Sequence, residues 1–232
     1  MPIETIAFDA DDTLWHSEVH FREASAEIID LLTQWQTEDE VERILNEIEM
    51  HNLLLYGYGV KGYILSMLEG AIAVSDGEIQ ADQVSRILAL GQQMLKAEVE
   101  LRPGVEACLE TLSGKYHMIV ITKGDLLDQN DKMQRSGLAE YFSDVEVVSQ
   151  KTPDVYAAIL KRHRLSPENF LMVGNSLPSD IIPILALGGK AVHIQADTTW
   201  AHEMADDFDH KQPGFYELTH LGELPDLLAK GL

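Results

Sequence analysis

The second half of this 232-residue chain alternates short apolar runs with amphipathic stretches, and this alternation most constrains the fold. The apolar runs are HMIVIT (117–122), VEVV (145–148), FLMVG (170–174) and AVHI (191–194). The segments between them, near residues 125–136, 153–163 and 178–188, have the apolar spacing of helices. Strands that are separated by single helices need crossover connections. This half of the chain therefore predicts a parallel β-sheet.

The chain begins with another apolar run, IETIAF (3–8), but the segment that follows has a different spacing of apolar residues. From Glu18 to about Val99, four stretches carry apolar residues at the three- and four-residue spacing of amphipathic helices. They are EVHFREASAEIIDLLTQW, EDEVERILNEIEMH, GYILSMLEGAIAV and ADQVSRILALGQQMLKAEV. We therefore predict an α/β, Rossmann-like parallel-sheet core from residues 1–15 and 100–232. An all-helical domain of four helices, residues 16–99, is inserted after its first strand.

The charge balance excludes several classes of partner. The chain has 39 acidic and 17 basic residues, a formal net charge of −22. Such a chain repels nucleic-acid phosphates and anionic lipid headgroups, so we expect neither nucleic acid nor membrane as a partner. Its longest stretches without charged residues are 11 residues (50–60 and 169–179), too short to span a bilayer. A single cysteine and a start without a secretory signal favour the cytoplasm.

Polar residues follow the apolar runs, where the strands of an open parallel sheet bind ligands. Asp9, Asp11 and Thr13 come after the first run, and Thr122 and Lys123 end or follow the second. The third run leads to Lys151, and the fourth to the stretch Gly174–Asp180, which contains Asn175. We expect these side chains to meet at one edge of the sheet.

This set of residues suits the chemistry of phosphate esters. Asp9 and Asp11 are two apart on an extended segment and point the same way. Asp9 is placed to attack phosphorus, while Asp11 protonates the leaving oxygen and later activates water. Mg²⁺ would hold the carboxylates and the phosphate together, and Lys151 and Thr122 would bind phosphate oxygens. The alternative is that these aspartates only form turns and cap helices. That would explain a single polar strand end, but it explains four of them less well.

The sequence resembles the haloacid dehalogenase-like superfamily, on its phosphatase side, with a helical cap inserted after the first strand. Asp9-x-Asp11-x-Thr13 matches the first motif of that family, Thr122 the second, Lys151 the third and Gly174–Asp180 the fourth, in the right order along essentially the whole chain. The resemblance implies that Asp9 is nucleophile and metal ligand. It implies that Asp11 is the acid/base and binds the metal through its backbone carbonyl, and that Lys151 steadies Asp9 and the phosphate.

Two positions depart from the family pattern. Asn175 stands where the family usually has an acid, so the fourth motif offers an oxygen ligand with one negative charge less. We therefore expect Asp180 to be the chief acid of that motif, as a metal ligand directly or through water. Thr152 follows Lys151 where a proline is commoner, which makes Lys123 a second candidate for the phosphate-binding cation.

The motif set predicts a Mg²⁺-dependent phosphatase that hydrolyses a small phosphorylated metabolite through an aspartyl-phosphate. Asp11 argues against a haloacid dehalogenase, because dehalogenases of this superfamily attack carbon and typically lack this second acid. A phosphomutase stays open, since transfer to a second hydroxyl uses the same residues. The alternative from another class is a non-catalytic phospho-acceptor or binding protein. No feature of the sequence predicts a particular oligomeric state.

The stretch Gly57–Gly62 matches the GxGxxG pattern of dinucleotide-binding proteins, but a helix-like segment precedes it where that pattern needs a strand. In the capped family, a loop between cap helices often selects the substrate. Tyr56, Tyr58 and Lys61 are therefore predicted specificity residues, with ordinary solvated loop residues as the alternative. Trp15 and His16 follow the first strand closely enough that we expect them to line the entrance.

Overall fold

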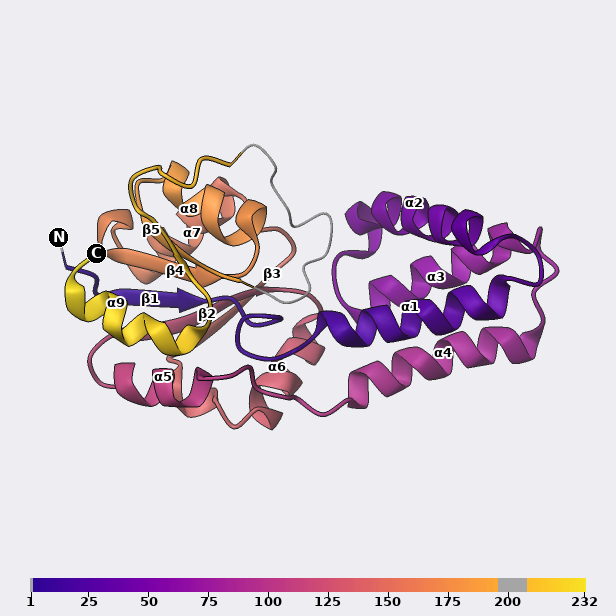
Figure 1. Ribbon diagram of the computed structural model, residues 1–232, viewed down its shortest axis with the longest axis horizontal. Coiled ribbons are helices and arrows are strands. Elements are labelled where there is room, and N and C mark those ends of the chain that lie inside the picture. The colour runs from indigo at the N-terminus through magenta and orange to yellow at the C-terminus, as the bar shows by residue number, and fades with distance from the viewer. Residues whose placement is uncertain (1, 196–207) are drawn as a thin grey trace. The chain divides into compact units, whose positions relative to one another are not determined.

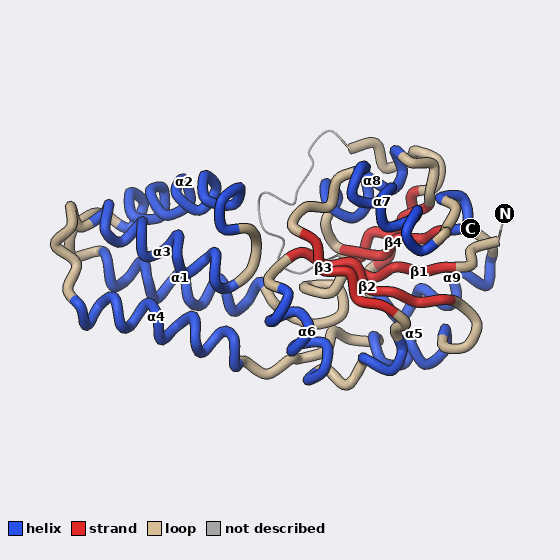
Figure 2. Tube along the Cα trace, turned by 180° about the vertical axis from the view of Figure 1, so that it is seen from behind, coloured by secondary structure: helices blue, strands red, loops and turns tan. Residues whose placement is uncertain are grey.

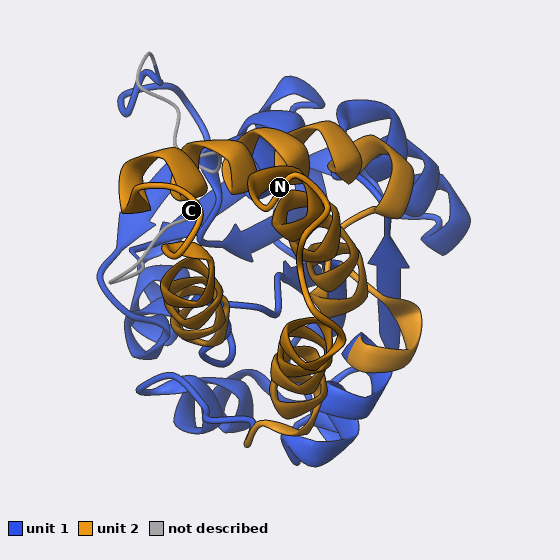
Figure 3. Cartoon of the chain, turned by 90° about the vertical axis from the view of Figure 1, so that its right-hand side faces the viewer, with its two compact units in different colours: residues 1–18, 99–123, 129–232 blue, residues 19–98, 124–128 orange. Residues whose placement is uncertain are grey.

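A computed structural model describes residues 2–195 and 208–232 of the chain, which forms two compact units (Figure 3). The first, called here the α/β unit, comprises Met1–Glu18, Val99–Lys123 and Gln129–Leu232. The second, called the helical unit, comprises Val19–Glu98 together with the short segment Gly124–Asp128.

The α/β unit is built on a six-stranded sheet in the order β3-β2-β1-β4-β5-β6 (Figure 1). The strands are β1 (Thr5–Phe8), β2 (His117–Lys123), β3 (Asp144–Val148), β4 (Phe170–Gly174), β5 (Lys190–Ile194) and β6 (Phe215–Leu218). Every pairing is parallel, so the predicted α/β fold is confirmed. β1 lies between β2 and β4, and Phe8 at its end is opposite Val120 and Val173. The residues that follow β1 therefore emerge at the centre of the sheet edge.

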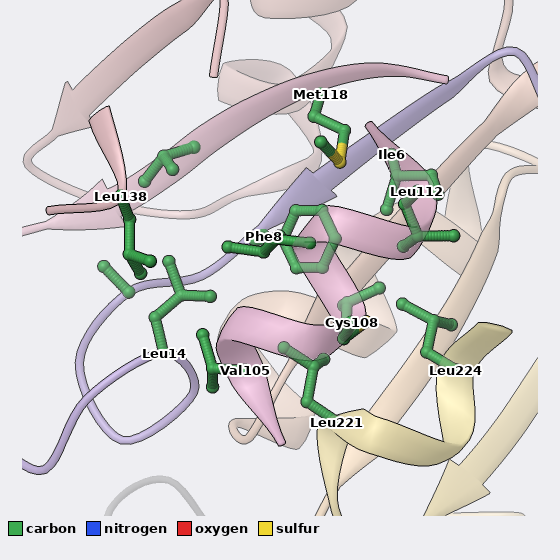
Figure 4. Packing of buried hydrophobic residues seen from close by; sticks show 14 of the residues in the cluster. Ile6, Phe8, Leu14, Val105, Cys108, Leu112, Met118, Leu138, Leu221 and Leu224 are labelled. Atoms are coloured by element: carbon green, nitrogen blue, oxygen red, sulfur yellow. The ribbon is translucent and has the colours of Figure 1, made fainter. Parts of the chain in front are cut away.

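Helices cover both faces of this sheet (Figure 2). They are α5 (Val105–Leu112), α6 (Leu126–Arg135, in this unit from Gln129), α7 (Pro153–His163), α8 (Ile182–Ala186) and α9 (Leu224–Lys230), with single 3₁₀ turns at Ala139–Tyr141, Pro167–Asn169 and Leu221–Glu223. Successive strand residues point to opposite faces. Ile6 and Phe8 of β1 pack with α5 and α9 (Figure 4), and Ala7 packs in the other core with Tyr156 of α7.

The helical unit has its own apolar core. Its helices are α1 (Glu18–Leu32), α2 (Glu38–Tyr56), α3 (Val60–Val74) and α4 (Ala81–Lys96), at the positions that the periodicity predicts. Buried residues from all of them form one cluster, including Ile28, Leu45, Met67 and Ile87. The GxGxxG pattern covers the turn between α2 and α3, where Gly57 and Gly59 have φ of 75° and 106°, and the first residues of α3. No helix of the described residues is both long and apolar enough to cross a bilayer.

The segment that leaves the α/β unit for the helical unit lies beside the segment that returns from it. Trp15 forms an antiparallel bridge with Leu101. The backbone N–H of His16 donates to the carbonyl of Glu100 at 3.0 Å, and that of Arg102 donates to the carbonyl of Leu14 at 3.0 Å. The outgoing and returning segments are thus tied to each other by the backbone.

Three details differ from the sequence-based expectation. The helix predicted near 178–188 consists of a π-helical turn, Leu177–Ile181, and the short helix α8. A proline near the start of each piece explains the break, because proline lacks the N–H that a continuous helix needs. β6 was not predicted, because its four residues, of which three are half-buried and Glu217 is exposed, lack a clear apolar run. Neither were α5 and α9, which are short.

Candidate active site

The end of β1 places Asp9 next to a buried lysine. The backbone N–H of Asp9 donates to the carbonyl of Val173 at 2.8 Å, which extends the sheet by one residue. Lys151 Nζ lies 2.5 Å from Asp9 Oδ1 and 2.6 Å from Asp180 Oδ1. All three side chains are buried. Residues from three different strand ends, predicted to meet, therefore form one charged cluster.

Burial and charge act against each other in this cluster. Burial raises the pKa of Asp9 to about 7, and the charge of Lys151 opposes this shift while that of Asp180 adds to it. Burial lowers the pKa of Lys151, but the charges of Asp180 and Asp9 outweigh it and hold the pKa above its ordinary value. Lys151 is therefore an ammonium ion at neutral pH, fixed beside a carboxyl group that titrates near neutrality.

Both carboxylate oxygens of Asp180, in the loop after β4, have a hydrogen-bond donor. While Oδ1 accepts from Lys151, Oδ2 accepts from the backbone N–H of Ser176 at 3.1 Å. A Cβ atom on Gly174 would lie 2.2 Å from Asp180 Oδ2, so only glycine lets the carboxylate approach this closely. In this geometry Asp180 positions Lys151 through Oδ1 and the Ser176 N–H through Oδ2, and its role as a metal ligand, directly or through water, stays a prediction.

Thr13 joins the first and fourth motifs. Its hydroxyl oxygen lies 3.1 Å from Asp9 Oδ2 and 3.1 Å from Asn175 Oδ1, so the two acceptor oxygens converge on one group. Within residues 2–195 and 208–232, no three His, Cys, Asp or Glu side chains are grouped so as to hold a metal ion. The predicted donors are the Asp9 carboxylate and the Asn175 amide oxygen, which the structure brings together at Thr13, and the Asp11 carbonyl, which the family resemblance implies. Mg²⁺ keeps several of its water ligands and needs only a few hard oxygen atoms from the protein. This donor set therefore fits the predicted metal.

Three donors hold the carboxylate of Asp11. Oδ1 accepts from Trp15 Nε1 at 2.8 Å and from Lys132 Nζ at 2.6 Å, and Oδ2 accepts from Gln129 Nε2 at 2.7 Å. Burial raises the pKa of Asp11, but the charge of Lys132 and the three hydrogen bonds outweigh it, and the pKa is lowered. Gln129 and Lys132 were not predicted. One feature of the sequence points to them. They are polar residues three apart on the helix after β2, so their side chains lie on the same face of that helix.

The end of β2 carries the two other predicted phosphate ligands. The buried hydroxyl of Thr122 lies 3.4 Å from Gln129 Oε1. Lys123 Nζ donates to Ser179 Oγ at 3.0 Å, in the loop after β4. Of the two cation candidates, Lys151 is the one that contacts Asp9 directly.

The predicted specificity residues have varied surroundings. Trp15 is 1% exposed, packs in the sheet core and donates to Asp11, so it is too deeply buried to line an entrance. His16 and Tyr58 are half-buried. Within the helical unit, the Tyr56 hydroxyl donates to Glu69, and Lys61 Nζ forms an ion pair with Asp125 at 2.8 Å.

Comparison with known proteins identifies the family. The family model for haloacid dehalogenase-like hydrolases matches residues 3–188, which include every strand end that carries a site residue. The chain belongs to the haloacid dehalogenase-like hydrolase family. A haloacid dehalogenase-like family hydrolase from Xanthomonas campestris shares 35% identity with it and superimposes with a TM-score of 0.88, over 98% of this chain and 91% of the other. Recognition of the family from its motifs is thus confirmed.

Two curated relatives of this haloacid dehalogenase-like hydrolase are both named glyceraldehyde 3-phosphate phosphatase. The one from Pyrococcus furiosus is 29% identical over 134 residues, 55% of this chain and 54% of the relative. The one from Methanothermobacter thermautotrophicus is 23% identical over 238 residues, 97% of this chain and 98% of the relative. The chain therefore spans about half the length of the first and nearly all of the second.

Proposed function

We propose that this haloacid dehalogenase-like hydrolase is a phosphatase that acts on a small phosphorylated metabolite through an aspartyl-phosphate on Asp9. The observation that carries the proposal is the ammonium of Lys151, buried between the carboxylates of Asp9 and Asp180. A cation fixed beside a carboxylate nucleophile attracts a phosphate dianion that the carboxylate alone would repel. The names of the two curated relatives support this activity.

In the first half-reaction, an oxygen of Asp9 attacks phosphorus and forms a P–O bond. The bond between phosphorus and the ester oxygen breaks, and Asp11 gives its proton to the leaving oxygen. Lys151 and the Thr122 hydroxyl bind the phosphoryl oxygens, and Lys123 is the second cation available at that edge. The alcohol leaves, and Asp9 carries the phosphoryl group.

In the second half-reaction, water attacks the phosphorus of the aspartyl-phosphate and gives a proton to Asp11. The P–O bond to Asp9 breaks, which releases inorganic phosphate and restores the carboxylate. Asp11 then carries the proton that it gives to the next leaving oxygen.

We assign a Mg²⁺ ion to Asp9, Asn175 and the backbone carbonyl of Asp11. When bound, it neutralises negative charge on the phosphate and the carboxylates. Asp180 holds Lys151 with one oxygen and the Ser176 N–H with the other, so we place it in a supporting position, with contact to the metal only through water. The Thr13 hydroxyl orients the oxygens of Asp9 and Asn175.

The helical unit is proposed as the cap that selects the substrate. Tyr56, Tyr58, Lys61 and His16 stay the predicted specificity residues. Lys61 already pairs with Asp125, so a substrate that binds Lys61 has to compete with that carboxylate. A substrate with a second anionic group would compete best with Asp125 for this ammonium.

Phosphate release from a panel of phosphorylated metabolites tests the proposal, with Mg²⁺ and with excess EDTA. We expect turnover with Mg²⁺, its loss with EDTA, and a decrease of at least about three orders of magnitude in Asp9→Asn. Asp131→Asn makes the same chemical change at an exposed carboxylate of α6 and should keep full activity. Undiminished turnover in Asp9→Asn contradicts the mechanism, and a lasting phospho-Asp9 without phosphate release identifies a phospho-acceptor instead.

A further inference from the structure

One face of α6 holds the Asp11 carboxylate at both of its oxygens. Lys132 Nζ contacts Oδ1 at 2.6 Å and Gln129 Nε2 contacts Oδ2 at 2.7 Å. The two residues are three apart on the helix and therefore project from the same side. Rotation of the carboxylate in any direction breaks at least one of these bonds.

Gln129 contacts both Asp11 of the first motif and Thr122 of the second. Its amide nitrogen donates to Asp11, and its amide oxygen lies 3.4 Å from the Thr122 hydroxyl. The side chain is 2% exposed. An amide has its donors on one end and its acceptor on the other, so a single orientation satisfies both neighbours. The acid/base of the first motif and the hydroxyl of the second are thus held at a fixed separation by one buried side chain.

A buried neighbour anchors α6 beneath these residues. Met133 follows Lys132 on α6, is 2% exposed and packs in the same core cluster as Phe8 and Leu14. This contact fixes the rotation of α6 about its axis. The Lys132 side chain is 15% exposed, so its ion pair with Asp11 is partly shielded from water.

We propose that Gln129 and Lys132 are positioning residues that hold Asp11 for proton transfer to the leaving oxygen. The inference rests on the proposed function. Proton transfer requires the carboxyl oxygen within hydrogen-bond reach of the leaving oxygen, and its rate falls steeply when the group is displaced. Loss of either α6 contact should therefore matter most for substrates whose leaving group needs a proton.

Two aryl phosphates that differ in leaving group test this role. Phenolate is a strong base and needs protonation as it leaves, whereas 4-nitrophenolate is a weak base and needs little. The measurement is kcat/KM for phenyl phosphate and for 4-nitrophenyl phosphate, with Mg²⁺. In Lys132→Met we expect the value for phenyl phosphate to fall about 10-fold or more and that for 4-nitrophenyl phosphate to fall less than about 3-fold. Lys132→Arg should restore part of the difference.

Arg135→Met is the matched control, because it removes a cation from the same helix one turn later, where Arg135 pairs with Asp131. It should leave both values unchanged. Gln129→Leu provides a second test if Lys132→Met does not fold. An equal loss for both substrates in Lys132→Met and Gln129→Leu indicates a merely structural role and overturns the inference.

Asp11→Asn separates this inference from the proposed function. If Asp11→Asn leaves the ratio of the two kcat/KM values unchanged, the acid role of Asp11 is wrong and the proposed mechanism fails. If Asp11→Asn changes the ratio and the α6 variants do not, only the positioning role is overturned. The indole N–H signal of Trp15 in a ¹H–¹⁵N spectrum gives a readout without turnover. It should shift in Lys132→Met and Gln129→Leu but not in Arg135→Met.

Discussion

Asp9 is a residue whose charge opposes folding. Asp9, Lys151 and Asp180 are buried together, so full ionisation leaves one uncompensated negative charge. Burial raises the pKa of Asp9 from 3.8 to about 7. A carboxyl group with a raised pKa stabilises the folded state fully below its unfolded pKa. That contribution is lost as the pH rises from about 4 through about 7.

Asp9→Asn should therefore make the protein more stable at alkaline pH while it abolishes turnover. We expect the Tm at pH 8 in EDTA to rise by roughly 3–6 °C, because the substitution leaves Lys151 and Asp180 as a balanced pair. At pH 4 the Tm values of variant and wild type should nearly agree, since both side chains are then neutral. Thermal unfolding followed by circular dichroism measures this. A variant less stable than wild type at pH 8 would contradict the argument.

At the residue scale, the sequence predicts the position of a group better than its contacts. Asp9, Lys151 and Asn175 could be placed together because parallel strands bring their carboxyl ends to one edge, whatever their side chains do. Gln129 and Lys132 could not, because their role depends on which face α6 turns toward Asp11. The rotation of α6 about its axis is set by how the helix packs on the sheet. The apolar periodicity of the segment alone does not predict that packing.

At the scale of elements, Asp12 connects the loop after β1 to the start of α1. Its two carboxylate oxygens accept from the backbone N–H groups of Ser17 and Glu18, each at 3.0 Å. Its carbonyl accepts from the buried guanidinium of Arg102, and its backbone has φ of 58°. Asp and Asn adopt this left-handed conformation more readily than other residues with a side chain.

Asp12→Ala should destabilise the protein by about 2 kcal/mol, because it removes the helix cap and strains the left-handed backbone. Asp12→Asn keeps an acceptor and a tolerated backbone conformation, so its loss should be less than about 1 kcal/mol. Urea unfolding at neutral pH gives both values. Equal losses in the two variants would mean that neither the cap nor the backbone conformation stabilises this junction.

The elements themselves were predictable where an apolar run is long enough to show its period. The four helices of the helical unit and the strands β1 to β5 meet that condition. β6 does not, because its four residues, FYEL, include a glutamate and none of them is buried. The segment after β4 has a helical period, but Pro183 and the close approach of Asp180 to Gly174 divide it into a π-helical turn and a short helix.

At the scale of the whole molecule, the net charge of −22 should weaken the folded state through self-repulsion. Raising NaCl from about 10 mM to about 150 mM shortens the Debye length from about 30 Å to about 8 Å. We expect the Tm at pH 8 to increase over this range, measured by scanning fluorimetry. At pH 4.6, the isoelectric point of the sequence, the increase should vanish. A Tm at pH 8 that falls with salt would show that local ion pairs outweigh the net repulsion.

The backbone pairing of Trp15 with Leu101 has a consequence for how such a chain can change over evolutionary time. The helical unit enters and leaves through neighbouring residues, so its two ends are already joined as a short hairpin would be. Helices can be added to, removed from or exchanged in that insertion without a break in β1 or a shift of Asp9. A single α/β scaffold can therefore exchange its inserted domain as a replaceable module.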